Sequence, residues 1–104
     1  MSTNFNISGR HLEVTPALDT YARNKLSKIE KIFNKITTVH VTLSIDNKMQ
    51  KAEAEVKVAG DQNKIFAESI TDDMYKSIDA LEDKLLKQVK KYHDKLKDHR
   101  EDNK

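Results

Sequence analysis

The feature that most constrains the fold is an alternating segment at residues 38–46, Thr-Val-His-Val-Thr-Leu-Ser-Ile-Asp. Every second residue is apolar, and the residues between them are polar. Because successive side chains of a β-strand point to opposite faces, this pattern predicts a strand with one buried and one exposed face. Such a strand needs a second layer to cover its apolar side.

Three further segments have the same period of two. Phe5 and Ile7 alternate with polar residues and predict a short strand that ends at Gly9. Residues 52–58 alternate alanine or valine with charged residues and predict another strand, and residues 65–69 predict a weaker one through Ile65, Ala67 and Ser69. The turns between these strands are expected at Asp46-Asn47-Lys48 and Gly60-Asp61.

Two other segments have a helical period. Thr15 and Pro16 suit the N-cap and first position of a helix, which we expect at about 15–34. Thr71-Asp72-Asp73 places carboxylates at the positive end of a second helix, expected to run to about residue 97 with Leu86 exposed. Its apolar stripe is Met74, Ile78, Leu81, Leu85, Val89, Tyr92 and Leu96.

The resulting element order, β-α-β-β-β-α, predicts an α+β fold. We expect a two-layer sandwich in which a four-stranded sheet has two helices packed on one face and the other face in water. The length of 104 residues suits one domain. We assign residues 1–98 to a single domain and residues 99–104 to a polar C-terminal tail.

Charge is distributed unevenly along this chain of net charge +2. Residues 15–36 carry five basic and two acidic residues (+3), residues 37–83 five and ten (−5), and residues 84–104 eight and four (+4). On a helical wheel of the second helix, four lysines fall within a sector of roughly 80°, away from most of the acidic residues. These four are Lys84, Lys87, Lys91 and Lys95.

The first helix carries its own lysine edge, which includes Lys25 and Lys28. With both helices on one side of the sheet, we expect a single basic surface, and we expect the acidic charge to remain on the sheet and loops. Lysine-rich helices are often merely solvated, but here the acids are segregated from the lysines instead of pairing along the helix. This segregation of charge favours a polyanion as the partner, but it does not distinguish RNA from DNA.

Several classes of function are disfavoured by what the sequence lacks. There is no cysteine for a disulfide or thiolate metal site, the four histidines are dispersed, and no glycine-rich phosphate loop or nucleophile elbow occurs. We therefore expect no enzyme, cofactor or functional metal. No segment is apolar enough for a membrane span or a signal peptide, so we expect a cytoplasmic protein. Aromatic base stacking is disfavoured too, because the polar side of residues 38–46 is histidine, threonine and serine.

Three segments together resemble the ribosome hibernation promoting factors and their relative, ribosome-associated inhibitor A. One is residues 6–18, at the first strand-to-helix junction, and another is Lys25-Leu26-Ser27-Lys28-Ile29. The third is Asp73-Met74-Tyr75-Lys76-Ser77-Ile78-Asp79 with Asp83-Lys84-Leu85, Gln88 and Lys95-Leu96. The resemblance spans nearly the whole chain and implies the same β-α-β-β-β-α fold.

The resemblance implies a factor that binds 16S rRNA in the channel between head and body of the 30S subunit. Such a factor blocks the mRNA and tRNA sites of the 70S ribosome and inhibits translation in stationary phase or stress. The RNA-binding residues carried over are Lys25, Lys28, Lys84, Lys87, Lys91, Lys95 and Tyr75. Lys87 stands where relatives often carry arginine, and Asp79 matches a position that we interpret as structural or orienting.

The length favours the short hibernation promoting factor, which promotes ribosome dimerisation together with a separate modulation factor. We expect such a protein to be a monomer in isolation. Two alternatives remain open. One is an inhibitor A type factor that silences 70S ribosomes and opposes dimerisation. The other is a generic double-stranded RNA-binding module, because double-stranded RNA-binding domains have the same αβββα order as this chain after its first strand, although that match is only an analogy of topology. A protein–protein adaptor using an acidic sheet face is a further hypothesis.

Overall fold

The computed structural model describes the backbone of residues 3–33, 35–60 and 64–102, and side chains in these ranges as far as residue 94. The strands are β1 (Asn4–Arg10), β2 (Ile36–Asp46), β3 (Met49–Val58) and β4 (Lys64–Thr71). The helices are α1 (Pro16–Leu26), α2 (Ile29–Ile32) and α3 (Met74–Asp102). In these ranges no helix combines the length and apolarity needed to cross a bilayer.

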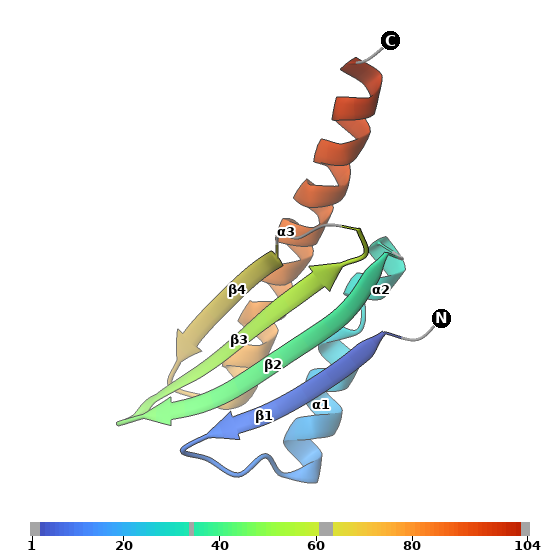
Figure 1. The fold of residues 1–104 in the computed structure, drawn as a ribbon. Helices are drawn as coiled ribbons and strands as arrows, with labels where there is room; N and C mark the ends of the chain where they lie inside the picture. The colour runs from blue at the N-terminus through green and yellow to red at the C-terminus, as the bar shows by residue number, and fades with distance from the viewer. Residues whose placement is uncertain (1–2, 34, 61–63, 103–104) are drawn as a thin grey trace.

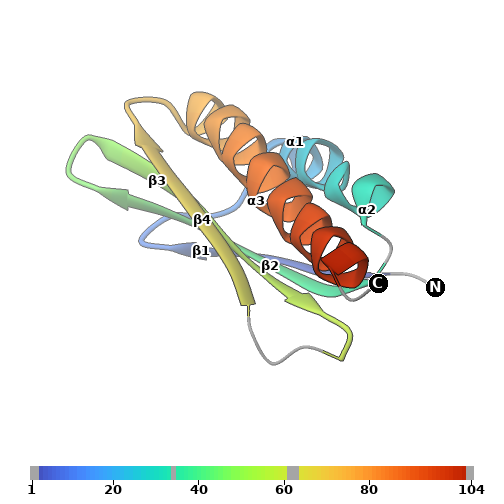
Figure 2. The same cartoon turned by 90° about the horizontal axis from the view of Figure 1, so that it is seen from above.

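The four strands form one sheet in the order β1-β2-β3-β4. β1 pairs parallel with β2, and β3 pairs antiparallel with both β2 and β4. The helices all lie on one side of this sheet, with α3 behind β3 and β4 and the α1–α2 segment beside it, behind β1 and β2 (Figures 1 and 2). This arrangement confirms the expected two-layer α+β fold.

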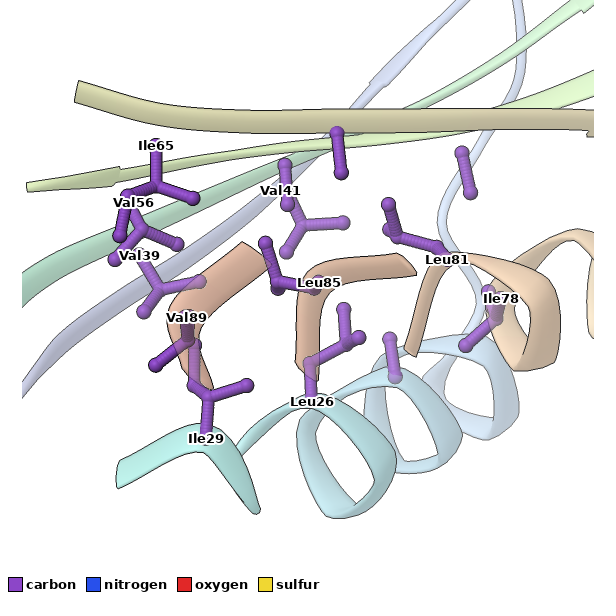
Figure 3. Packing of buried hydrophobic residues seen from close by; sticks show 14 of the residues in the cluster. Leu26, Ile29, Val39, Val41, Val56, Ile65, Ile78, Leu81, Leu85 and Val89 are labelled. Atoms are coloured by element: carbon purple, nitrogen blue, oxygen red, sulfur yellow. The ribbon is translucent and has the colours of Figure 1, made fainter. Parts of the chain in front are cut away.

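The core lies between the two layers. The alternation of apolar and polar residues along the strands creates it, because the alternating apolar side chains face the helices. Val39, Val41 and Leu43 of β2 are fully buried, and the facing residues of β3 in the register, such as Ala54 opposite Val41, are buried with them. Each fully buried valine, leucine or isoleucine contributes about 1.5–3 kcal/mol relative to an exposed one. From the helices, the core receives Leu26, Ile29, Ile78, Leu81, Leu85 and Val89 (Figure 3).

The expectation that Gly9 ends the first strand is wrong. β1 continues through Gly9 to Arg10, with Gly9 paired opposite Leu43 of β2. A β-carbon at Gly9 would collide with the backbone carbonyl oxygen of Leu12, where the chain folds back after the strand. Glycine is therefore needed here for a close approach of the backbone, and this role does not interrupt the strand.

The first helix is divided, whereas the sequence predicted one helix over about 15–34. Its start is as expected, because the Thr15 hydroxyl oxygen accepts a hydrogen bond from the Leu18 amide at 3.2 Å. At Ser27 and Lys28 the chain turns, and the amides of Glu30 and Lys31 bond back three residues, to Ser27 and Lys28, at 3.1 Å each. This tighter bonding separates α1 from α2 and turns Ile29 into the core.

The last helix begins as expected and ends later. The Asp73 carboxylate accepts a hydrogen bond from the Tyr75 amide at 3.2 Å, which caps the first turn of α3. The helix continues to Asp102, past the end expected at about residue 97. Leu86, expected to be exposed, is half-buried and packs against the core.

Candidate nucleic-acid interface

An open groove of about 570 Å³ runs between α3 and the edge strand β4. It exists because α3 lies over β3 and β4, while β4 has a neighbouring strand on one side only. The helix contributes Lys84, Lys87, Gln88 and Lys91 to this groove, and the strand contributes Phe66, Ala67 and Glu68.

We call Lys84, Lys87 and Lys91 the groove lysines. The Lys84 ammonium donates a hydrogen bond of 2.9 Å to the backbone carbonyl of Glu68, on the free edge of β4. In the part of the chain that the structure describes, none of the three has a carboxylate within ion-pair distance, although Lys51, Lys64, Lys25 and Lys28 all do. The fourth lysine expected on this side, Lys95, has its side chain outside the described residues.

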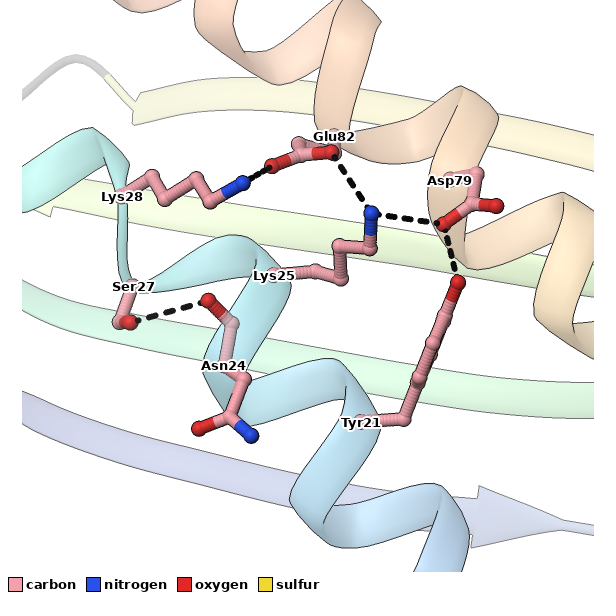
Figure 4. Close-up of polar contacts among 7 residues, drawn as sticks. All are labelled: Tyr21, Asn24, Lys25, Ser27, Lys28, Asp79 and Glu82. Atoms are coloured by element: carbon pink, nitrogen blue, oxygen red, sulfur yellow. Dashed lines mark hydrogen bonds and ion pairs between the residues drawn. The ribbon is translucent and has the colours of Figure 1, made fainter.

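The lysines of α1 lie on the other flank of α3 and are paired. Lys25 contacts Asp79 at 3.5 Å and Glu82 at 3.8 Å, and Lys28 contacts Glu82 at 3.3 Å (Figure 4). The Glu82 side chain is only 11% exposed, so it is covered between the two helices. Two carboxylates of α3 thus hold two ammonium groups of the α1–α2 segment in place.

Tyr21 completes this contact between α1 and α3. Its hydroxyl donates a 2.6 Å hydrogen bond to the Asp79 carboxylate, and its ring meets that of Tyr75 edge-on at 4.9 Å between centroids. The bond favours the neutral phenol and, with burial and the charge of Asp79, raises the pKa of Tyr21 to about 12. Asp79 therefore has the orienting role expected of it, and Tyr75, which is 41% exposed, lies beside α1.

The two lysine groups therefore lie on opposite flanks of α3, instead of side by side as expected. The expectation of an acidic sheet face is wrong as well. Three outward glutamates of the sheet are matched by lysines: Lys51 contacts Glu53 at 3.2 Å and Glu68 at 3.3 Å, and Lys64 contacts Glu55 at 3.1 Å. Two of these contacts cross between β3 and β4 and one runs along β3, so lysines balance the glutamates of this face.

Phe66 is the groove residue that the sequence interpretation missed. The alternation of Ile65, Ala67 and Ser69 already implied that Phe66 points away from the core, and its ring is 50% exposed. That this ring borders the groove lysines depends on where α3 packs, and no local pattern reveals it.

No cluster of three or more potential metal-ligating side chains occurs among the described residues.

The chain is similar to known proteins in both sequence and fold. A family model described as "Sigma 54 modulation protein / S30EA ribosomal protein" matches residues 5–97. The ribosome hibernation promoting factor of Pseudomonas putida is 43% identical over 90 residues, covering 86% of each chain. That of Klebsiella oxytoca is 40% identical over 94 residues, covering 90% of this chain and 97% of the relative. A solved ribosomal subunit interface protein from Coxiella burnetii superimposes with a TM-score of 0.80 at 31% identity, covering 88% of this chain and 98% of that one.

Proposed function

The chain belongs to the sigma 54 modulation protein / S30EA ribosomal protein family and has a ribosome-associated role in hibernation, and we propose that it acts by binding 16S rRNA in the decoding channel of the 30S subunit. There it blocks the mRNA and tRNA sites and inhibits translation in stationary phase or stress. With a separate modulation factor on the same ribosome, it promotes the pairing of ribosomes into dimers.

The observation that carries the proposal is the unpaired charge of the groove lysines. A lysine already held by a carboxylate gains less from a phosphate than one facing water alone, because the existing pair must be weakened. Lys84, Lys87 and Lys91 have no such pair in the described chain and project from about 10 Å of one rigid helix. Each contact with a phosphate releases condensed counterions and so favours binding.

The paired lysines have a second part in this proposal. Lys25 and Lys28 approach Asp79 and Glu82 without being buried, since their side chains are 32% and 54% exposed. Held in one orientation, they lose less side-chain entropy when they bind RNA than free lysines lose. Tyr75, half-exposed beside them, is proposed as an RNA contact on the same flank.

The named relatives support the hibernation promoting type over the inhibitor A type. Both curated relatives carry the name ribosome hibernation promoting factor, and the matched segment fills 97% of the Klebsiella oxytoca protein. A factor of this kind works in the cytoplasm as a monomer, by occupancy and without catalysis. We therefore propose inhibition that saturates near one molecule per ribosome.

Sedimentation with purified 30S subunits tests the proposal. We expect the protein to pellet with 30S subunits at a stoichiometry of one, and to remain bound when free duplex RNA is added in excess. Displacement by the duplex at equal phosphate concentration would instead indicate a generic double-stranded RNA-binding module. Initiator tRNA in excess should release the protein, because the two occupy overlapping sites.

A further inference from the structure

Phe66 is an exposed aromatic ring that the fold does not require. It lies on the face of β4 opposite the core, at a position where its neighbours along the strand, Ile65 and Ala67, supply the buried side chains. Among the described residues, no other ring and no cation packs against it. Exposing half of a phenylalanine ring costs hydrophobic free energy, so a ligand that covers it would be favoured.

The ring lies between two hollows of the surface. On one side is the groove with Lys84, Lys87 and Lys91. On the other side is a shallow hollow of about 440 Å³ on the open sheet face, which Phe66 shares with His40 and Glu55, its neighbours across the strands. A ligand lying along the groove lysines can therefore place a flat group on the ring without entering the protein.

We propose that the groove lysines and Phe66 form a subsite for an unpaired RNA strand, in which the lysines bind consecutive phosphates and the Phe66 ring stacks on one base. The inference deepens the proposed function and rests on it. A cationic groove with an aromatic platform is the arrangement by which proteins hold single strands. The platform here comes from β4, and not from the strand at residues 38–46 whose polar face argued against stacking.

The geometry favours an unpaired strand over a duplex. In a double helix both faces of each base are covered by its neighbours, so a side chain can stack on a base only after that base has left the helix. A duplex would contact the groove lysines through phosphates and leave Phe66 uncovered.

The same geometry disfavours a peptide strand added to the edge of β4. The carbonyl of Glu68, which an added strand would need, already accepts the Lys84 ammonium. Among the described residues, the one carboxylate that lines the groove, that of Glu68, is engaged by Lys51 at 3.3 Å. Its repulsion of a phosphate is thereby reduced, which leaves the three lysine charges to dominate.

Substitutions of Phe66 provide the first test, with affinity measured for 30S subunits and for a short single-stranded RNA. Phe66→Ala and Phe66→Leu should each lose between about fivefold and about a hundredfold, the range for loss of one base–aromatic stack, whereas Phe66→Tyr should bind as the unchanged protein does. Ile70→Ala is the matched control, because Ile70 is also 50% exposed on the same face of β4 but does not line the groove. Its affinity should stay within twofold.

The chain contains no tryptophan, so Phe66→Trp introduces a single fluorescent reporter at the subsite. Stacking on a base should quench this tryptophan when single-stranded RNA or 30S subunits bind, and duplex RNA should not. A tryptophan placed by Ile70→Trp should keep its emission in every case.

Two results would overturn the inference. One is full 30S affinity in Phe66→Leu, which would mean that the ring makes only a general apolar contact, as with a protein partner. The other is quenching by duplex RNA equal to that by a single strand. In either case, the proposed function would stand as long as the unchanged protein binds 30S subunits. If the unchanged protein did not bind 30S subunits at all, the proposed function and this inference would both be wrong.

Discussion

At the scale of single residues, Asp79 is where the two helices are fixed to one another. It accepts the Tyr21 hydroxyl at 2.6 Å and lies 3.5 Å from the Lys25 ammonium, so one carboxylate of α3 restrains two side chains of α1. Lys25 also lies 5.6 Å from the centre of the Tyr21 ring, which adds a cation–π contact. The three groups form one network, so a substitution at any one of them should alter the interactions of the other two.

This network predicts an unusual tyrosine titration. Because the folded protein raises the pKa of Tyr21 from 10.0 to about 12, the bond to Asp79 stabilises the fold fully below pH 10, and its contribution is lost as the pH rises toward 12. In a phenolate absorbance titration, Tyr21 should ionise near 12. Tyr21→Phe should remove that step, and Asp79→Asn should move it toward 10.

Tyr75→Phe is the control for the titration, since Tyr75 touches Tyr21 through its ring and makes no hydrogen bond to Asp79 in the described chain. The high step should persist in that variant. If the high step instead persisted in Tyr21→Phe, the hydrogen bond to Asp79 would be assigned to the wrong tyrosine.

At the scale of elements, the position of α3 decides which lysines are free. The helix turns Asp79 and Glu82 toward α1, where they meet Lys25 and Lys28, and turns the groove lysines toward β4. Residues 79 and 82 are about one helical turn apart and so share a face, while the groove lysines occupy another. The helix therefore separates a paired flank from an unpaired flank.

Charge reversal on the unpaired flank should abolish binding. We expect Lys87→Glu combined with Lys91→Glu to eliminate 30S binding in the sedimentation assay without changing the circular dichroism spectrum. For the unchanged protein, about four to six phosphate contacts predict a slope of log K against log[salt] of about −3 to −5. Single neutral substitutions at either lysine should reduce the magnitude of this slope by about one.

A variant matched in charge separates this effect from net charge alone. Lys48→Glu with Lys57→Glu also changes the net charge from +2 to −2 (2 − 4 = −2), at exposed positions on the β2–β3 turn and on β3. It should retain most of the affinity. Equal losses in the two double variants would mean that overall charge, and not the groove, governs binding.

At the scale of the whole molecule, its two faces differ in what they can bind. The helical side carries the groove lysines, while the outer sheet face carries lysine–glutamate pairs. Phe66 and Ile70 are exposed apolar residues of that face separated along β4 by Glu68, and Met49 is exposed at the start of β3. A stable dimer interface needs a larger and continuous apolar area, which this face does not provide.

From this we expect no ribosome dimers with this protein alone. Added to 70S ribosomes, it should give silent 70S particles on a sucrose gradient, because once the helical side is on RNA the described residues offer no second surface suited to joining two ribosomes. Addition of a modulation factor should produce dimers, and this protein should increase their yield. A gradient in which it lowers that yield would instead support the inhibitor A alternative.

Much of the fold follows from local sequence pattern. The alternation in residues 38–46 and 52–58 indicated which side chains of β2 and β3 are buried, because a strand has a fixed period of two. The helical stripe of α3 was equally readable, since Ile78, Leu81 and Leu85 recur at the spacing of a helix turn. These features depend only on neighbours in the sequence, so the sequence determined them, and with them the two-layer fold.

Only the tertiary structure decided how the charged and aromatic residues meet. Tyr21 and Asp79 are 58 positions apart, and Phe66 reaches the groove lysines only because α3 packs over β4. The passage of β1 through Gly9 also depends on backbone that folds back against the strand, and the division of the first helix at Ser27 accompanies the burial of Ile29 in the core. Periodicity specifies the face of an element on which a residue lies, but not which element that face will meet. That choice is made by packing, and it decides which lysines are paired and which remain free.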